Sequence, residues 1–446
     1  NMATVITSSQ IIPVDESFKV SAGPGAGKTH WLINHIKNVV SNSHKLQVVK
    51  KVACITYTNV GADTITSRLD IGNDMVEVCT IHSFLYANVV KPYVHLVAEE
   101  FEVKTIDMVV VDDSNFKSGG IAAQILNAIG KPWIDTTIFL KGLEKAMWHY
   151  ESHEYKHYKP KYPQKYGKWF VSNDCYMEFK KWIWRRGYIS FDDILYFSYI
   201  LLSRYPNIYK LIKSKYPYVF VDEFQDTVPF VVDFLTQLGN DGVIVGVVGD
   251  KAQSIYDFLG STVQQFDNFT VPRMQEYEIR GNMRSTKQII ELLNIIRNDF
   301  TQEWLNGSEG IIPVLLVGDM LDCYQQSIDK SGTDDIQSLA YQNMVTNSMR
   351  NKNGLRQVVN VLEVDFDSNP ARQLAVKTLI KAVEYTRMND LRNAWHQLDI
   401  IDRDRTKTIL VLRRLLEGYH EYKDRNLLEF YNFLVSNVNI NLTKIV

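Results

Sequence analysis

The sequence has few cysteines, no long apolar run and no leader-like beginning. Its four cysteines are far apart and form no Cys-X-X-Cys pair, which excludes the usual zinc and redox motifs and fits a reducing compartment. Apolar runs such as 243–248 have the length of a core strand and are far shorter than the roughly 20 residues that cross a bilayer. Because no basic stretch followed by an apolar one opens the chain, we expect a cytoplasmic protein without membrane contact.

An excess of charge of one sign is also missing. The formal net charge is -2, so any binding of nucleic acid must come from local basic patches rather than from the field of the whole molecule. Hydrophobic residues make up 45% of the 446 residues and charged residues 22%, as in ordinary globular proteins. At this length we expect two or more domains.

Short β-branched runs alternate with helical patterns in the first ninety residues. Strands separated by helices, here beginning at Lys28 and Asn59, predict a parallel sheet with right-handed crossovers. The alternation stops from about residue 90 to 190, which indicates an insertion, and then resumes with buried-type apolar runs. The expected strands are 17–22, 50–58, 76–80, 218–221 and 243–248.

The one concentration of charge lies inside this insertion, at residues 155–186. It contains nine lysines and arginines against two acids, with aromatic residues between them. Because basic side chains bind phosphates and aromatic faces stack on bases, we predict that it forms part of a nucleic-acid surface. The alternative is a solvated basic face over a small aromatic core. The basic residues are Lys156, Lys159, Lys161, Lys165, Lys168, Lys180, Lys181, Arg185 and Arg186.

Residues 22–29 read AGPGAGKT between an expected strand and an expected helix, the context of a phosphate-binding loop. Its glycines let backbone N–H groups approach phosphate oxygens at a helix N-terminus. Lys28 can reach the β and γ phosphates, and the Thr29 hydroxyl can ligate Mg²⁺. The pattern therefore predicts a site for ATP and Mg²⁺. Its expected nucleotide-binding residues are Gly23, Gly25, Ala26, Gly27, Lys28 and Thr29.

A nucleotide site also needs a carboxylate at the end of a neighbouring strand. The apolar run 218–221 ends in Asp222 and Glu223, and a purely structural role would not offset the cost of burying charge there. We expect Asp222 to hold Mg²⁺ and Glu223 to act as the base that activates the attacking water.

With DEFQDT at 222–227 included, the chain resembles the UvrD, Rep and PcrA group of superfamily 1A helicases. That family tolerates alanine at the first position of the phosphate loop, as Ala22 requires. Six motifs match in the order of the family. Beyond the two already described, they are ITYTN at 55–59, TIHSF at 80–84, VGDKAQSIY at 248–256 and NMRS at 282–285.

The resemblance implies an α/β fold of RecA-like P-loop NTPase motor domains with parallel sheets and helical insertions. The second motor domain would be partial. The residue pattern itself predicts a strand at 311–317 and, from about residue 355, a helical subdomain with amphipathic helices at 374–382 and 427–435. The expected parts are 1–89 and 190–270 for the first motor domain, 90–189 for its helical insertion, 271–350 for the partial second motor domain and 351–446 for the second helical insertion.

The resemblance also implies roles for single residues. Gln10 would read the adenine edge, Gln253 would sense the γ-phosphate, and Arg284 would place a guanidinium on the transferring phosphate and so join Lys28 in catalysis. The aromatic members of the DNA set would stack on bases, although Tyr57 and Phe258 could instead be core aromatics. The residues expected to contact single-stranded DNA are Tyr57, Thr58, Asn59, Thr80, His82, Ser83, Tyr256 and Phe258.

The sequence departs from the family at several positions. Met283 stands where the family stacks a tyrosine on adenine, and Val60 and Leu259 replace two common basic residues. The two C-terminal family motifs, one of which carries an arginine finger, do not occur. We therefore expect this chain alone to bind ATP but to show little or no DNA-stimulated hydrolysis or unwinding.

Two functions are compatible with these motifs. The first is an ATP-driven translocase or helicase on single-stranded DNA, in DNA repair or anti-phage defence, with the 3′ to 5′ direction that the resemblance implies. The second is an ATP-sensing regulatory subunit that binds DNA and controls a separate nuclease. The chain is also similar to the helicase-like subunit of the Gabija anti-phage system, which works with such a partner, and we find no nuclease motif in it.

Overall fold

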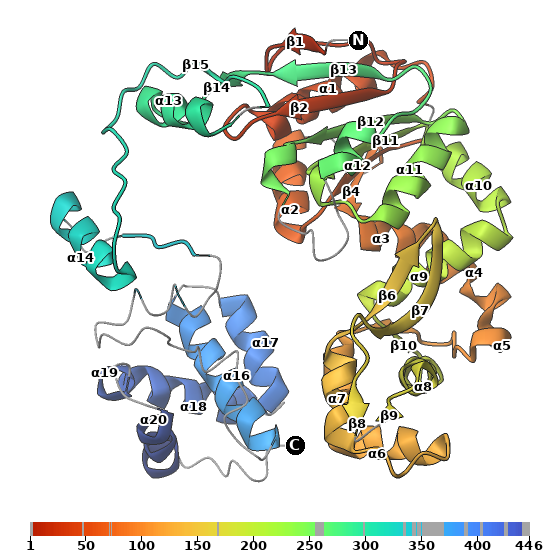
Figure 1. Cartoon of the computed structure of the whole chain (residues 1–446), viewed down its shortest axis with the longest axis vertical. Coiled ribbons are helices and arrows are strands. Elements are labelled where there is room, and N and C mark those ends of the chain that lie inside the picture. The colour runs from red at the N-terminus through yellow and green to blue at the C-terminus, as the bar shows by residue number, and fades with distance from the viewer. Residues whose placement is uncertain are drawn as a thin grey trace. The chain divides into compact units, whose positions relative to one another are not determined.

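The computed structural model of the chain divides into two units, Asn1–Pro313 and Val314–Val446 (Figure 1). The residues that it describes are 3–46, 49–70, 72, 74–166, 169–254, 263–297, 299–332, 336–340, 345, 349, 370–387, 391–401, 405–422 and 427–438.

A seven-stranded sheet with the order β1-β13-β2-β12-β11-β3-β4 forms the centre of the first unit. Every neighbouring pair in it is parallel, which confirms the predicted α/β fold with a parallel sheet. The strands are β1 (Thr4–Ile6), β2 (Phe18–Ala22), β3 (Val52–Thr56), β4 (Val76–Thr80), β11 (Tyr218–Val221), β12 (Ile244–Gly249) and β13 (Gln275–Ile279).

The apolar runs are continuous because helices cover both faces of this sheet. In β11, Tyr218 and Phe220 face one core with α1 (Lys28–Asn42) and α2 (Asn59–Leu69). The alternate residues Val219 and Val221 face the other core with α11 (Pro229–Asn240). The sheet is packed so closely that a Cβ on Gly246 would lie 2.1 Å from the Phe18 ring.

The segment between β4 and β11, which includes the insertion expected at 90–189, is mainly helical. Its helical elements are α3 (Ile81–Leu85), η1 (Tyr86–Val90), α4 (Lys91–Tyr93), η2 (Val94–Leu96), α5 (Ala98–Phe101), η3 (Asp113–Phe116), α6 (Gly119–Ala128), α7 (Thr136–Glu144), α8 (Asn173–Trp184), α9 (Phe191–Arg204) and α10 (Asn207–Lys215). It also contains two-residue strands, namely β5 (Val109–Val110), β8 (Lys165–Tyr166), β9 (Trp169–Phe170) and β10 (Tyr188–Ile189).

An antiparallel hairpin in the insertion was not expected from the sequence. It consists of β6 (Ala146–Glu151) and β7 (Glu154–Pro160), in which Trp148 lies opposite Tyr158. The turn residues Ser152 and His153 both have positive φ, at 54° and 64°. Two-residue hairpin turns with positive φ usually contain glycine or asparagine. Because neither residue occurs in this turn, the sequence did not indicate the hairpin.

The basic segment 155–186 is only partly a solvated surface, so the prediction is wrong for Lys180. The Lys180 side chain is 0% exposed and pairs with Asp113 at 2.9 Å and Asp193 at 3.0 Å. Lys181 and Arg185 are more exposed, and both pair with Glu102. These side chains of α8 and its C-terminal end form ion pairs inside the insertion, because acidic residues from other elements pack against the helix.

A short segment follows β13 in the first unit. It contains β14 (Gly281–Asn282), α13 (Lys287–Ile296) and β15 (Glu303–Trp304), and β14 and β15 pair with each other in parallel. The strand expected at 311–317 is wrong, since these described residues form no strand. Leu315 is 88% exposed, so the apolar run has no neighbouring strand on which to pack.

The second unit is helical, as predicted for 374–382 and 427–435. Ala375, Leu379 and Val383 share a small core with Leu415 and Leu434. Among the helices that the structure describes, none is long and apolar enough to cross a membrane. The helices are α14 (Met320–Ser331), α16 (Pro370–Arg387), α17 (Leu391–Ile401), α18 (Arg405–Glu417), α19 (Tyr419–Tyr422), α20 (Leu427–Phe433) and η7 (Leu434–Val438).

Candidate nucleotide and nucleic-acid site

The phosphate loop connects β2 to α1 in the expected way. Gly25 and Gly27 have φ of 73° and 81°, a left-handed conformation that glycine adopts without strain. The Trp31 N–H donates to the Gly27 carbonyl over 2.9 Å and begins the helical ladder of α1. The first N–H groups of this helix therefore remain available for phosphate oxygens.

The two carboxylates at the end of β11 lie beside this loop. The Thr29 hydroxyl donates to Oδ2 of Asp222 over 3.1 Å, and Nζ of Lys28 lies 3.9 Å from Oε2 of Glu223. Burial of Asp222 and the nearby charge of Glu223 raise the pKa of its carboxyl to about 6. A buried carboxylate beside a threonine hydroxyl fits a site for a divalent cation. An exposed carboxylate would be hydrated by water and would not need a cation to compensate its charge.

Glu223 occupies an unusual backbone conformation directly after the strand. Its φ is 52°, which is uncommon for a residue other than glycine, and its N–H donates to the carboxylate of Asp222 over 3.0 Å. Its Oε2 accepts a hydrogen bond from Nε2 of Gln225 over 2.8 Å. The turn therefore points the two neighbouring carboxylates in fixed and different directions.

The segment after β13 covers the phosphate loop. The Met283 N–H donates to the Gly25 carbonyl over 2.9 Å, and Nδ2 of Asn282 donates to the Pro24 carbonyl over 2.8 Å. A Cβ on Gly25 would lie 2.8 Å from Cβ of Arg284. Among the described residues, the exposed Arg284 guanidinium has no ion-pair partner, so it is available to a phosphate.

The two glutamines with expected roles lie on different elements. Gln10 is exposed, and its carbonyl accepts a hydrogen bond from Nε1 of Trp31, which places it beside α1. Gln253 ends η5 (Lys251–Gln253), the turn that follows β12, and its N–H donates to the Asp250 carbonyl. Because β12 lies between β2 and β11 and is parallel to both, Gln253 lies at the carboxyl ends of the strands, on the same side of the sheet as the phosphate loop.

The expected DNA contacts gather at the ends of β3 and β4. Thr58 caps α2 by accepting from the Gly61 N–H, and Thr80 caps α3 and donates to the Ser83 hydroxyl, so both threonines have structural roles as well. Asn59 is exposed at the beginning of α2. Tyr256 and Phe258 lie outside the described residues.

A cavity of about 600 Å³ lies next to these residues, between the hairpin β6–β7 and the end of β11. Tyr57 and His82 line it together with Glu223, so the cavity joins the candidate DNA residues to the candidate base. Burial lowers the pKa of His82 to about 4, which keeps its ring neutral at ordinary pH. Lys159 of β7 and Lys161, which directly follows β7, line the same space.

Phe191 is a candidate contact that the sequence did not single out. Its side chain is 53% exposed, lines the cavity and meets the His82 ring edge-on at 5.8 Å. It begins α9 directly after Ser190, which caps that helix in a box with Asp193. The capping pattern could have located the helix, but only the fold brings Phe191 to His82.

Comparison with known proteins adds to this geometry. The model of the UvrD/REP helicase N-terminal domain matches residues 5–272. The chain belongs to the UvrD/Rep helicase family. The resemblance inferred from the motifs is thereby confirmed, and a mixed α/β RecA-like fold agrees with it.

Several named relatives of this UvrD/Rep-family chain are helicases. It is 28% identical over 342 residues to Gabija protein GajB of Bacillus cereus, covering 66% of this chain and 48% of that protein. It is 27% identical over 318 residues to the ATP-dependent DNA helicase srs2 of Schizosaccharomyces pombe, covering 63% and 33%. The ATP-dependent DNA helicase PcrA of Bacillus subtilis is 25% identical over 316 residues, covering 67% and 40%. The matched part therefore spans less than half the length of each relative.

Proposed function

We propose that this UvrD/Rep-family chain binds ATP with Mg²⁺ between its phosphate loop and β11, and that hydrolysis there drives movement along single-stranded DNA, in the 3′ to 5′ direction. The observation that carries the proposal is the meeting of Thr29, Asp222 and Glu223 beside Lys28. The chain would act in DNA repair or anti-phage defence, the settings that its resemblance to the UvrD, Rep and PcrA group and to the Gabija system implies.

Each side chain has a separate task in this proposal. Lys28 and the N-terminal amides of α1 hold phosphate charge, while Thr29 and Asp222 hold Mg²⁺, which neutralises charge on the phosphates. Glu223 orients water and accepts its proton. Arg284, which lies over the loop, stabilises the charge that develops on the transferring phosphoryl group. Gln10 contacts the adenine and Gln253 the γ-phosphate.

The strand of DNA would run along the cavity that Tyr57, His82 and Phe191 line. Aromatic faces bind bases of any sequence by stacking, and Lys159 and Lys161 supply phosphate contacts. Because the cavity also borders Glu223, DNA in this position could influence hydrolysis directly.

A second function is an ATP-sensing subunit that controls a separate nuclease. The similarity to a Gabija protein favours it, because the resemblance to that system implies such a partner. In that case nucleotide and DNA binding would be retained, whereas strand displacement would be absent.

Two variants test the nucleotide site. Lys28→Ala should lose nucleotide binding, measured with a fluorescent ATP analogue, because it removes the phosphate-binding cation. Glu223→Gln should bind the analogue like the parent and fail to turn ATP over. Parent-like turnover by Glu223→Gln would refute the assignment of the base. Displacement of a strand from a 3′-tailed duplex, compared with a 5′-tailed one, separates the helicase from the sensor.

A further inference from the structure

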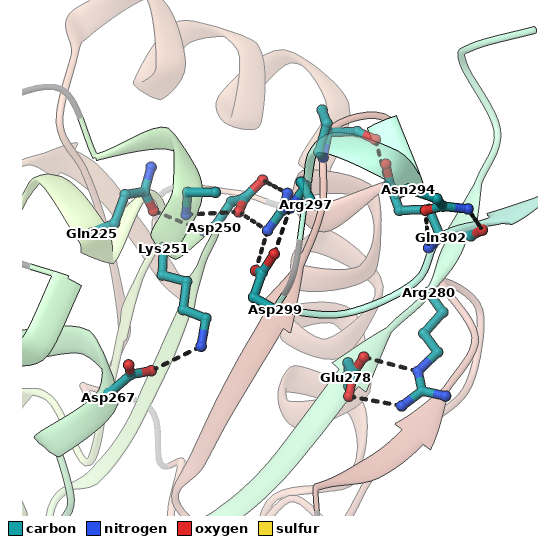
Figure 2. Close-up of polar contacts among 12 residues, drawn as sticks. Gln225, Asp250, Lys251, Asp267, Glu278, Arg280, Asn294, Arg297, Asp299 and Gln302 are labelled. Atoms are coloured by element: carbon teal, nitrogen blue, oxygen red, sulfur yellow. Dashed lines mark hydrogen bonds and ion pairs between the residues drawn. The ribbon is translucent and has the colours of Figure 1, made fainter. Parts of the chain in front are cut away.

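Arg297, directly after α13, forms a buried two-pronged pair with Asp250 at the end of β12 (Figure 2). Its Nη1 donates to Oδ2 of Asp250 over 3.0 Å and its Nη2 to Oδ1 over 2.9 Å. The Asp250 side chain is 0% exposed and that of Arg297 is 9% exposed. Asp299 accepts from Nε of the same guanidinium, and the Phe300 ring lies 4.5 Å from it. Such planar, water-excluded pairing suits arginine and not lysine.

A line of hydrogen bonds leads from Asp250 to the candidate base. The Asp250 N–H donates to Oε1 of Gln225 over 3.0 Å, and Nε2 of Gln225 donates to Oε2 of Glu223 over 2.8 Å. Gln225 is 3% exposed, and a Cβ on Gly249 would lie 2.5 Å from its Oε1. Since an amide accepts with its oxygen and donates with its nitrogen, Asp250 and Glu223 together fix how Gln225 lies.

A second line of hydrogen bonds begins on α13, just before Arg297, and leads to the cover of the phosphate loop. Asn294, one turn earlier, accepts from the Gln302 N–H over 2.8 Å and donates to its carbonyl over 2.9 Å (Figure 2). Nε2 of Gln302 then donates to the Pro24 carbonyl over 3.0 Å, where Asn282 also donates. Arg297 therefore binds Asp250, which supports Glu223 through Gln225. It also directly follows the helix α13, whose Asn294 supports the cover of the phosphate loop.

We propose that Arg297 is a positioning residue for ATP hydrolysis, an inference that rests on the function proposed above. By holding Asp250, it fixes Gln225 and through it the carboxylate of Glu223. Without the guanidinium, the buried Asp250 keeps only the hydrogen bond from the Ala252 N–H, over 3.1 Å, and has no cation beside it, so the turn after β12 must shift to hydrate it and Gln225 must shift as well. Lys28 meets this line only at Oε2 of Glu223, 3.9 Å from its Nζ, and it stays on α1 beside the phosphate loop when Gln225 shifts. Pro24 also keeps its bond from Asn282, so nucleotide binding survives.

The test compares Arg297→Met and Arg297→Lys with the parent. For each full chain we would measure kcat and KM for ATP, the Kd of fluorescent ADP and the melting temperature. We expect kcat to fall by about tenfold or more in Arg297→Met and by less in Arg297→Lys, with KM and Kd within about threefold of the parent. Adding Asp250→Asn to Arg297→Met should lower kcat no further, because both changes act on one pair.

Arg280→Met is the matched control. Arg280 lies on the same segment and also pairs with a carboxylate, Glu278 at 2.8 Å, but it is half-exposed and outside both lines (Figure 2). Its kcat should equal that of the parent. An unchanged kcat in folded Arg297→Met, or a parallel loss of kcat, ADP affinity and melting temperature, would overturn the proposal. A parent that neither bound fluorescent ADP nor turned over ATP would refute the proposed function itself, and the role of Arg297 in hydrolysis with it.

Discussion

The hydroxyl of Thr29 donates to the buried carboxylate of Asp222 over 3.1 Å, and this contact joins the phosphate loop to the end of β11. Asp222 is 4% exposed, so its charge is poorly hydrated. A divalent cation would stabilise this charge in place of the hydration that burial removes, because metal ions favour the ionised form of a neighbouring carboxyl. Binding of Mg²⁺ and binding of the nucleotide are therefore expected to be coupled at this contact.

Thr29→Ala should weaken binding of ATP about tenfold or more when Mg²⁺ is present, and much less in its absence. The reason is the loss of one oxygen that faces the cation, a contact of about the size of a hydrogen bond to a charged group. Thr29→Ser retains the hydroxyl and should bind within about threefold of the parent. Titrations of fluorescent ATP with Mg²⁺ and with EDTA measure both. If Thr29→Ala lost the same ATP affinity with Mg²⁺ as with EDTA, Thr29 would not be a ligand of the cation.

Gly25→Ala should impair nucleotide binding without unfolding the protein. The new Cβ would lie 2.5 Å from Oδ1 of Asn282, and the φ of 73° is unfavourable for alanine by about 1–2 kcal/mol. Either the cover must move or the loop must change shape. Gly119→Ala is the control, because a Cβ at that position meets nothing within 4 Å and the residue begins a helix. Calorimetric titration with ADP compares the two, and parent-like affinity in Gly25→Ala would argue against a tight cover.

The sequence predicted the parts of the site that are encoded locally. The glycines, Lys28 and Thr29 lie within one turn between a strand and a helix, and the fold supplies that context as expected. Asp222 and Glu223 were predictable for the same reason, since an apolar run ends in them. Their positions relative to the loop follow from the parallel order of the sheet.

The contacts between distant segments were not predictable. Lys180 was expected on a surface, because nothing in its own segment reveals that Asp113, 67 positions earlier, packs against it. Arg297 belongs to no motif, and its partner Asp250 is 47 positions away. The run 311–317 has strand-like composition, but a strand also needs a neighbour. In each case the structure depends on a residue or strand that is distant in the sequence, and the local sequence pattern does not reveal it.

Lys180→Met should destabilise the insertion by about 3–5 kcal/mol, because it leaves the buried Asp193 without its cation, while Asp113 keeps its ion pair with Lys117. Lys181→Met, which breaks a half-exposed pair with Glu102, should cost less than about 1 kcal/mol. Hydrogen exchange of the α8 amides provides the measurement for both variants. A stable Lys180→Met protein with weaker DNA binding would restore the interpretation of this residue as a phosphate contact.

The double variant Lys159→Glu/Lys161→Glu should weaken binding of single-stranded DNA and flatten its dependence on salt. Each lost phosphate contact lowers the slope of log K against log salt by about 0.7 for a single strand. The control is Lys141→Glu/Lys145→Glu, which makes the same change of charge on exposed residues that do not line the cavity. Fluorescence anisotropy with a labelled oligonucleotide at several salt concentrations distinguishes them. Equal effects of the two double variants would indicate a response to net charge alone.

His35→Leu should make the first unit less sensitive to acid. His35 is 4% exposed, its ring stacks on Trp31, and burial lowers its pKa to about 4 from an ordinary value of 6.5. The folded protein therefore keeps this ring neutral while the unfolded chain takes up a proton. Stability from this source is complete above about pH 6.5 and is lost as the pH falls toward 4, by roughly 3 kcal/mol in total.

Leucine has a similar volume and cannot take up the proton, so its contribution to stability does not change over this range. Urea unfolding between pH 4 and 7, followed by hydrogen exchange of the sheet amides, should show a shallower decline for His35→Leu than for the parent. Part of the decline will remain, because burial also lowers the pKa of His82 to about 4. The exposed His44→Leu is the control and should follow the parent curve. If His35→Leu and His44→Leu lose stability with the same slope as the parent, the buried ring at position 35 is not the group that titrates.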